Sequence, residues 1–212
     1  MRTKTLLLTA ALAAAGAASA MAQNVYSVNA VGYVNKSVVN GYSIVANPFV
    51  VANESLDALV PTPNDGTVVY KPVPGTFEIR NYDASLPGWD PDGATTINLG
   101  GGVIFFNPGA PFTITFVGEV KQGSPVSNPV APGLQIKSSM VPQAGLVSAL
   151  GFTPAGLNTV YQYAPNGSDF IINIYDPTLP GWDPSEPVVG IAEGFWIDSA
   201  SGEAWNRNFT VN

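Results

Sequence analysis

The chain has 212 residues, of which 46% are hydrophobic and only 11% are charged, and it contains neither cysteine nor histidine. Their absence excludes disulfides, a lipid anchor on an N-terminal cysteine, Cys–His and Ser–His–Asp catalysis, and most zinc, copper and haem sites. The formal net charge is −7, and an acidic surface repels phosphate backbones, so nucleic acid is not an expected partner.

Residues 1–22 have the features of a secretory signal peptide. Arg2 and Lys4 form a basic start, residues 6–18 are almost wholly apolar, and Ala20-Met21-Ala22 fits the small-x-small cleavage pattern. We therefore expect a mature chain that begins at Gln23 and has no membrane span. It would be secreted or held at the cell surface, with the periplasm as a further location. A retained N-terminal anchor is the alternative, although the apolar run is short for a bilayer.

Residues 23–121 are predicted to form a first β-rich unit. Short runs that alternate or are wholly apolar lie between clusters of Gly, Pro and Asn, as in sandwiches and barrels. Residues 53–59 combine a capping residue with helical spacing, so one short helix is expected there. The expected strands are Tyr26–Val34, Tyr42–Ala46, Thr67–Lys71, Phe77–Tyr82, Gly102–Phe106 and Phe112–Val120.

Residues 122–132 are rich in Gly, Ser and Pro and predict a connector. Residues 133–212 would then form a second β-unit, with a helical turn at 145–151. Its expected strands are Leu134–Lys137, Thr159–Tyr163, Phe170–Tyr175, Gly194–Asp198 and Asn208–Val211.

The second unit repeats the first. The segment Tyr82–Pro91 recurs 93 positions later as Tyr175–Pro184, with Leu-Pro-Gly-Trp-Asp-Pro in both copies, and Gly102–Phe105 resembles Gly194–Ile197. Matches in the same order indicate a duplication. The sequence therefore predicts an all-β protein of two tandem homologous β-sandwich or barrel-like units, each with at most one short helix.

The two Leu-Pro-Gly-Trp-Asp-Pro loops are the most distinctive motif and have two interpretations. In the first, Pro-Gly makes a turn, the Trp folds onto the core and the Asp bonds to local amides. In the second, Trp89 and Trp182 are exposed and stack on sugar rings, while Asp90 and Asp183 accept hydrogen bonds from sugar hydroxyls.

The same loops carry enough carboxylates to consider calcium, which prefers several oxygen ligands at close range. The regular Asp-x-Asp-x-Asp-Gly spacing is missing, and no other cofactor is expected. Paired carboxylates would also permit a glycoside hydrolase without His or Cys, although no pair stands out. The candidate calcium ligands are Asp83, Asp90 and Asp92 in unit one and Asp176, Asp183 and Glu186 in unit two.

Several of these motifs together resemble a group of secreted bacterial β-repeat proteins of unknown function. The resemblance rests on Val-Gly-Tyr-Val at Val31–Val34, Gly-Tyr-Ser-Ile-Val-Ala-Asn-Pro at Gly41–Pro48, and Thr-Phe-Val-Gly-Glu-Val at Thr115–Val120. Unit two lacks the Asn-Pro element and has Ser138–Met140 there. The resemblance implies export and a β-unit, and it implies no activity.

Export, a duplicated β-unit, low charge and the missing catalytic residue types favour a non-enzymatic structural or interaction protein of the cell surface or extracellular space. Its expected partners are further copies of itself, through exposed strand edges, or a surface polysaccharide. A carbohydrate-binding module that uses the two Trp loops is the alternative function.

Overall fold

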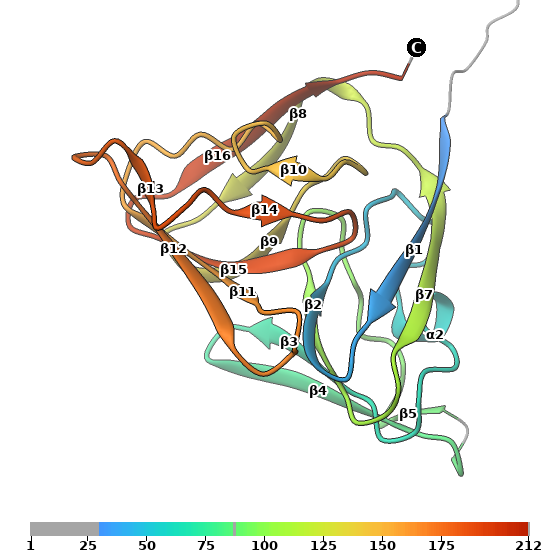
Figure 1. The fold of residues 1–212 in the computed structure, drawn as a ribbon. Coiled ribbons are helices and arrows are strands. Elements are labelled where there is room, and N and C mark those ends of the chain that lie inside the picture. Colours follow the sequence, from blue (N-terminus) through green and yellow to red (C-terminus); the bar gives the residue numbers. More distant parts are fainter. Residues whose placement is uncertain (1–29, 87, 212) are drawn as a thin grey trace, which may run out of the picture.

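The fold is described from a computed structural model, which covers residues 30–86 and 88–211. Nearly all of the regular structure in these residues is β-strand, arranged as two similar units with one short helix, so the predicted fold class is confirmed. In Figure 1 the blue-to-green strands of unit one and the yellow-to-red strands of unit two lie side by side. The predicted signal peptide and residues 23–29 lie outside the described part of the chain. No described helix is long and apolar enough to cross a membrane.

Unit one pairs a five-stranded antiparallel sheet, in the order β2-β6-β3-β4-β5, with a two-stranded ribbon of β1 and β7. One helix, α2 (Leu56–Leu59), is capped by Ser55, whose hydroxyl accepts a hydrogen bond from the Ala58 N–H at 3.3 Å. The strands are β1 (Val31–Val38), β2 (Gly41–Val45), β3 (Val68–Val73), β4 (Thr76–Asp83), β5 (Gly88–Asp90), β6 (Val103–Asn107) and β7 (Phe112–Glu119).

Unit two repeats this plan with a sheet in the order β13-β12-β11-β15-β9 and a ribbon of β16 and β8. A further short pair, β10 with β14, takes the place of the bridge between Ser55 and Thr96 in unit one. The strands are β8 (Gly123–Val130), β9 (Gly133–Ser138), β10 (Gly145–Leu146), β11 (Asn158–Tyr163), β12 (Phe170–Asp176), β13 (Gly181–Asp183), β14 (Val188–Val189), β15 (Gly194–Ser199) and β16 (Glu203–Phe209).

Each unit has its own hydrophobic core between its sheet and its ribbon. In unit one, Val38 of the ribbon and Phe105 of the sheet are fully buried in one cluster with Phe116. In unit two, Val130 and Trp205 of the ribbon pack in one cluster with Phe195 of the sheet. Alternation along each strand directs every second side chain into this layer. Two sandwiches, each with a sheet and a ribbon, follow from the same alternating pattern.

Three local predictions differ from the structure in whole or in part, and the first is the strand expected at Asn208–Val211, which lies at Glu203–Phe209 instead. The expected connector, residues 122–132, contains strand β8, which pairs with β16 over most of its length. Pro125 and Pro129 made this segment look like a connector, because proline lacks the N–H that a central strand needs. Both strands of a two-stranded ribbon are edge strands, so a missing N–H is tolerated there. The helical turn expected at 145–151 is present in part: Gly145 and Leu146 form strand β10, and the Leu150 N–H then donates to the Leu146 carbonyl at 3.0 Å, as in one turn of a helix.

The two units dock around an approximate two-fold axis. Strands β2 and β9 are the equivalent edge strands of the two sheets. Ala46 directly follows β2, and Ser138, 92 positions later, is the last residue of β9. The Ala46 N–H donates to the Ala192 carbonyl of unit two at 3.1 Å, and the Ser138 N–H donates to the Gly100 carbonyl of unit one, also at 3.1 Å. Ala192 and Gly100 are again 92 positions apart. An approximately isologous interface, in which these backbone contacts are made twice, therefore joins the two halves of one chain.

The centre of this interface is apolar and tightly packed. Ile44, Ile104 and Ile136 form a separate buried cluster between the units, with Tyr42 and Trp196 packed against it. Two equivalent glycines make room for it. A Cβ on Gly102 would lie 2.9 Å from Ile136 Cγ2, and a Cβ on Gly194 would lie 2.7 Å from Ile44 Cγ2. Each glycine therefore accommodates the isoleucine of the other unit.

We predict that Gly194→Ala or Gly102→Ala destabilises the docked pair, because the new methyl group must displace a packed isoleucine. Compared with Gly101→Ala, the free energy of unfolding should fall by about 1–3 kcal/mol. A Cβ on Gly101 would meet nothing closer than the Asn98 carbonyl oxygen at 3.6 Å, so that variant is the matched control. Urea unfolding followed by circular dichroism measures the difference. Equal stability of all three variants would contradict the close approach.

Candidate functional site

The predicted Trp loops are not an exposed stacking platform. Strand β5 carries Trp89 into the core, where it is only 6% exposed and its indole N–H donates to the Val60 carbonyl at 3.1 Å. Trp182, on the equivalent strand β13, is partly buried and packs against the core of unit two and against Tyr175. The carbohydrate interpretation of Trp89 is therefore wrong, because its ring lies in the core.

The two tryptophans also differ because unit two buries another one. Trp205, on β16, donates its indole N–H to the Leu150 carbonyl at 2.7 Å. Leu150 lies in the turn of unit two and Val60 ends α2 in unit one, so in each unit an indole donates to a carbonyl of the corresponding turn, but from a different strand. Trp205 takes the buried role of Trp89, which leaves Trp182 nearer the surface.

The six carboxylates proposed for calcium do not gather, and the described residues contain no cluster of three acidic side chains that could hold a metal. Asp90 and Asp183 are exposed. The side chains of Asp83 and Asp176 cap their own turns, where hydrogen bonds from Ser85 and Thr178, respectively, lower their pKa values. The remaining two also have other partners.

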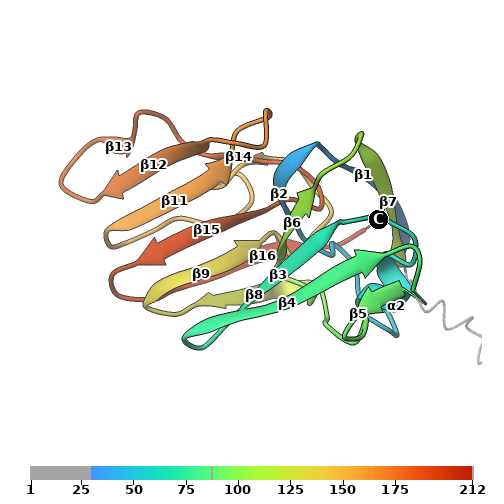
Figure 2. The ribbon, with the colours of Figure 1, turned by 90° about the horizontal axis from the view of Figure 1, so that it is seen from below.

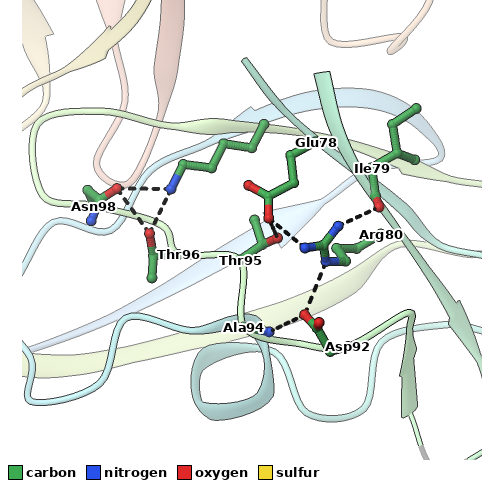
Figure 3. Close-up of polar contacts among 9 residues, drawn as sticks. Glu78, Ile79, Arg80, Asp92, Ala94, Thr95, Thr96 and Asn98 are labelled. Carbon is green, nitrogen blue, oxygen red and sulfur yellow. Dashed lines mark hydrogen bonds and ion pairs between the residues drawn. The ribbon is translucent and has the colours of Figure 1, made fainter. Parts of the chain in front are cut away.

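Asp92 and Glu186, the other two proposed ligands, are engaged in local structure. Asp92 accepts a hydrogen bond from the Ala94 N–H at 3.0 Å and lies 3.3 Å from Arg80 Nε, as Figure 3 shows. Arg80 is also paired with Glu78, which in turn accepts a hydrogen bond from the Thr95 hydroxyl. This network fixes the 92–98 loop beneath β4. Glu186 accepts a hydrogen bond from the Ser148 N–H at 2.6 Å.

The docking of the units creates two equivalent grooves, one on each side of the two-fold axis. Each lies between a β-hairpin of one unit and the edge strand of the other. One groove, between the β11–β12 hairpin and β2, encloses about 240 Å³. The other, between the β3–β4 hairpin and β9, encloses about 470 Å³ and is called the open groove here. Figure 2 shows the β3–β4 hairpin running alongside β9.

A difference in hairpin length accounts for the difference in volume. Tyr70 pairs with Ile79 across the first hairpin, and Tyr161 pairs with Ile172 across the second, so the second hairpin is two residues longer. Its tip reaches β2, and the Gly167 carbonyl accepts a hydrogen bond from the Tyr42 N–H at 2.8 Å. The shorter tip at Gly75 has open space around it.

The edge of β9 therefore presents an unused backbone donor to the open groove. Leu134 is the equivalent of Tyr42, and the Ser138 N–H, four residues on, points away from β15 toward Gly100. Because strand N–H groups alternate in direction, the Leu134 N–H points the same way. No acceptor among the described residues meets it there. The Leu134 side chain is itself 60% exposed.

The walls of the open groove are polar and carry two lysines. Lys71 Nζ donates to Thr96 Oγ1 at 2.7 Å and to Asn98 Oδ1 at 3.1 Å, and Asn98 Nδ2 donates to Glu54. Figure 3 shows Thr96 and Asn98 side by side. On the other wall, Lys137 Nζ donates to Asn128 Oδ1 at 3.3 Å.

Lys137 stands where unit one has the fully buried Val45. Burial lowers the pKa of Lys137, because the ammonium group loses water without gaining a carboxylate. Neither Lys71 nor Lys137 forms an ion pair with any described residue. Of the eight basic residues in the chain, two precede residue 23, so these two are a third of the rest.

An aromatic pocket adjoins the open groove at Leu134. It encloses about 240 Å³ and lies on the outer face of the unit-two sheet. Phe170 packs against Tyr161 and Tyr163, and Phe77 of unit one meets Trp196 edge to face at 6.3 Å. The pocket residues are Leu134, Tyr161, Phe170, Trp196 and Asp198.

The sequence analysis missed this surface, although one signal was available. The spacing between repeats changes from 91 to 93 positions across the hairpin, which marks the two-residue difference in length. Neither the open groove nor the aromatic pocket is lined by two carboxylates. A ligand could therefore be bound by the free backbone edge of β9, by the two lysine ammonium groups and by the aromatic rings of the pocket.

Comparisons of this chain with models of protein families, with curated protein sequences and with solved structures found no significant match.

We predict that the amide hydrogen of Leu134 exchanges with solvent much faster than that of Tyr42. The Tyr42 N–H is held by the Gly167 carbonyl, whereas the Leu134 N–H faces the open groove. A single lost backbone bond of about 1 kcal/mol corresponds to a protection difference of about fivefold or more. Hydrogen–deuterium exchange followed by NMR measures both amides, with Gln135, which faces β15, as the protected control. Equal protection of Leu134 and Tyr42 would mean that the groove is closed in solution.

Proposed function

We propose that the chain is an exported, non-enzymatic interaction protein of the cell surface or extracellular space. The observation that supports this most directly is the apolar outer face of its two five-stranded sheets. On β12, Phe170, Ile172 and Ile174 are each more than two-fifths exposed, and on β4 Phe77 and Ile79 are equally exposed. Contiguous apolar surface on a folded protein marks an interaction site.

The position of this face supports the same proposal. Phe77 and Phe170 occupy equivalent places in the two units, and both reach toward the interface between them. The face borders the aromatic pocket and the open groove, so apolar, aromatic and cationic groups form one surface. The signal peptide predicted from residues 1–22 would bring this surface outside the cytoplasm.

We predict that the paired substitution Ile172→Ser and Ile174→Ser weakens association while leaving the fold intact, because both side chains point away from the core. The mature chain, beginning at Gln23, would be tested by analytical ultracentrifugation at rising concentration and by co-sedimentation with envelopes of the producing bacterium. Removal of two half-exposed isoleucines should weaken binding by about tenfold.

The matched control is Val117→Ser, which changes an exposed apolar residue on the ribbon of unit one, away from the sheet face. It should behave as the unsubstituted chain in both assays. The proposal fails if the paired variant, the control and the unsubstituted chain associate equally. It also fails if the full chain is not exported and processed in its host.

A second candidate function, carbohydrate binding, is favoured by the aromatic pocket. Trp196, Tyr161 and Phe170 offer ring faces, and Asp198 offers a carboxylate acceptor beside them, which is a combination that suits sugar rings and hydroxyls. Trp196 stands where unit one has Ile104, so the aromatic ring at this position is a feature of unit two alone.

If the pocket binds neutral sugars, Trp196→Ala should abolish retardation of the mature chain in gels that contain xylan or β-glucan. Base stacking on an indole ring is worth about 1–3 kcal/mol, and a similar loss here would weaken binding by about tenfold or more. Trp182→Ala is the control, because Trp182 lies on β13, outside the pocket. Retardation that depends on Trp182 and not on Trp196 would contradict this assignment.

A further inference from the structure

We propose that the open groove binds an extended, acidic segment of a partner polypeptide, which adds to the free edge of β9. This inference rests on the proposed function and names the partner chemistry for one part of the surface. Three independent observations carry it: an unused strand edge, a filled copy of the same groove in the same chain, and two unpaired lysines.

The filled groove shows what kind of group fits. On the β2 side, the edge N–H of Tyr42 already has a backbone acceptor, the Gly167 carbonyl, which the tip of the β11–β12 hairpin supplies along the groove wall. The ring of Tyr163, next to that segment, stacks on Tyr42 at 5.5 Å. On the β9 side, the hairpin is too short to supply such a segment, and Leu134 takes the place of Tyr42. A carbonyl from another polypeptide completes the equivalent bond.

The shape of the groove selects a single segment over a second sheet. Residues Pro72–Gly75 of the hairpin form one wall and Leu134–Lys137 form the other. Pairing with the β9 edge of another copy of this chain would bring two β3–β4 hairpins to the same place. A loop or a chain end has no such hairpin and can enter.

The charge of the groove selects an acidic segment. Lys71 and Lys137 line opposite walls and neither is paired with a carboxylate, whereas Lys36, beside the filled groove, is paired with Glu193 at 3.7 Å. Alternate side chains of an added strand point to opposite faces. A segment that alternates apolar and acidic residues would place its apolar side chains beside Leu134 and the aromatic pocket, and its carboxylates near the lysines.

The test uses the mature chain and a capped synthetic peptide that alternates valine and glutamate over the length of β9. Calorimetry measures affinity, and NMR measures amide protection. We expect binding, with new protection of the Leu134 amide. Lys71→Met and Lys137→Met should each weaken binding by about fivefold, as expected for the loss of one ion pair. Lys121→Met, outside the groove, is the matched control and should bind as the unsubstituted chain does.

Two altered peptides separate backbone from charge. The same peptide with N-methyl groups on alternate amides cannot pair as a strand, and the peptide with lysine in place of glutamate has the wrong charge. Both should bind at least about tenfold more weakly. If Lys137→Met does not fold, Lys71→Met still decides the role of charge, because the Lys71 ammonium group lies at the edge of the groove.

The inference is overturned if the mature chain binds no acidic peptide, or if the N-methylated peptide binds equally well. It is also overturned if polygalacturonate binds with the same lysine dependence and without protection of Leu134, which would assign the groove to an acidic polysaccharide. If the peptide does not bind but the chain still associates with envelopes through Ile172 and Ile174, only this inference fails. Loss of envelope association with intact peptide binding would remove only the proposed function.

Discussion

The close approach of two glycines and two isoleucines at the approximate two-fold axis is the contact on which the rest of the structure depends. Gly102 and Gly194 allow Ile136 and Ile44 to meet between the units, and the equivalent backbone bonds of Ala46 and Ser138 flank them. Without disulfides, the halves are held together by burial, by these bonds and by further contacts such as the Tyr42–Gly167 backbone bond and the Lys36–Glu193 ion pair. The two grooves exist only because this contact sets each hairpin against the other unit's edge strand.

Symmetry then makes the differences between the units informative. A duplicated unit that docks on its copy places each residue in two equivalent environments, so a change in one copy is not required by the fold. Val45 becomes Lys137, Ile104 becomes Trp196, and the second hairpin is longer by two residues. The first two changes alter the walls or the surroundings of the open groove, and the third supplies the partner of the β2 edge in the other groove. A half-buried lysine in place of a core valine costs stability, which favours a role for it in binding.

The sequence was sufficient for the features that depend on local pattern. Alternating apolar residues between Gly, Pro and Asn clusters located β2, β3, β4 and β6 and their copies, and the repeated Tyr82–Pro91 segment showed the duplication. The sequence was insufficient where a structural role depends on two segments that are far apart in the chain. Trp205 replaces Trp89 from another strand, and β8 tolerates Pro125 and Pro129 only because it pairs on one side. No local pattern carries that information.

The candidate surface was harder to predict because docking creates it. Leu134, Lys71 and Trp196 lie in three separate segments, and only the approach of the two units brings them to one place. The most compact motif in the sequence is the Trp loop, but in unit one its tryptophan ring lies in the core. In a duplicated chain, a comparison of equivalent positions in the two copies identifies candidate binding residues more directly than a search for motifs. The residues that remain, Lys137, Trp196 and the longer hairpin, point to the surface that burial and charge identify independently.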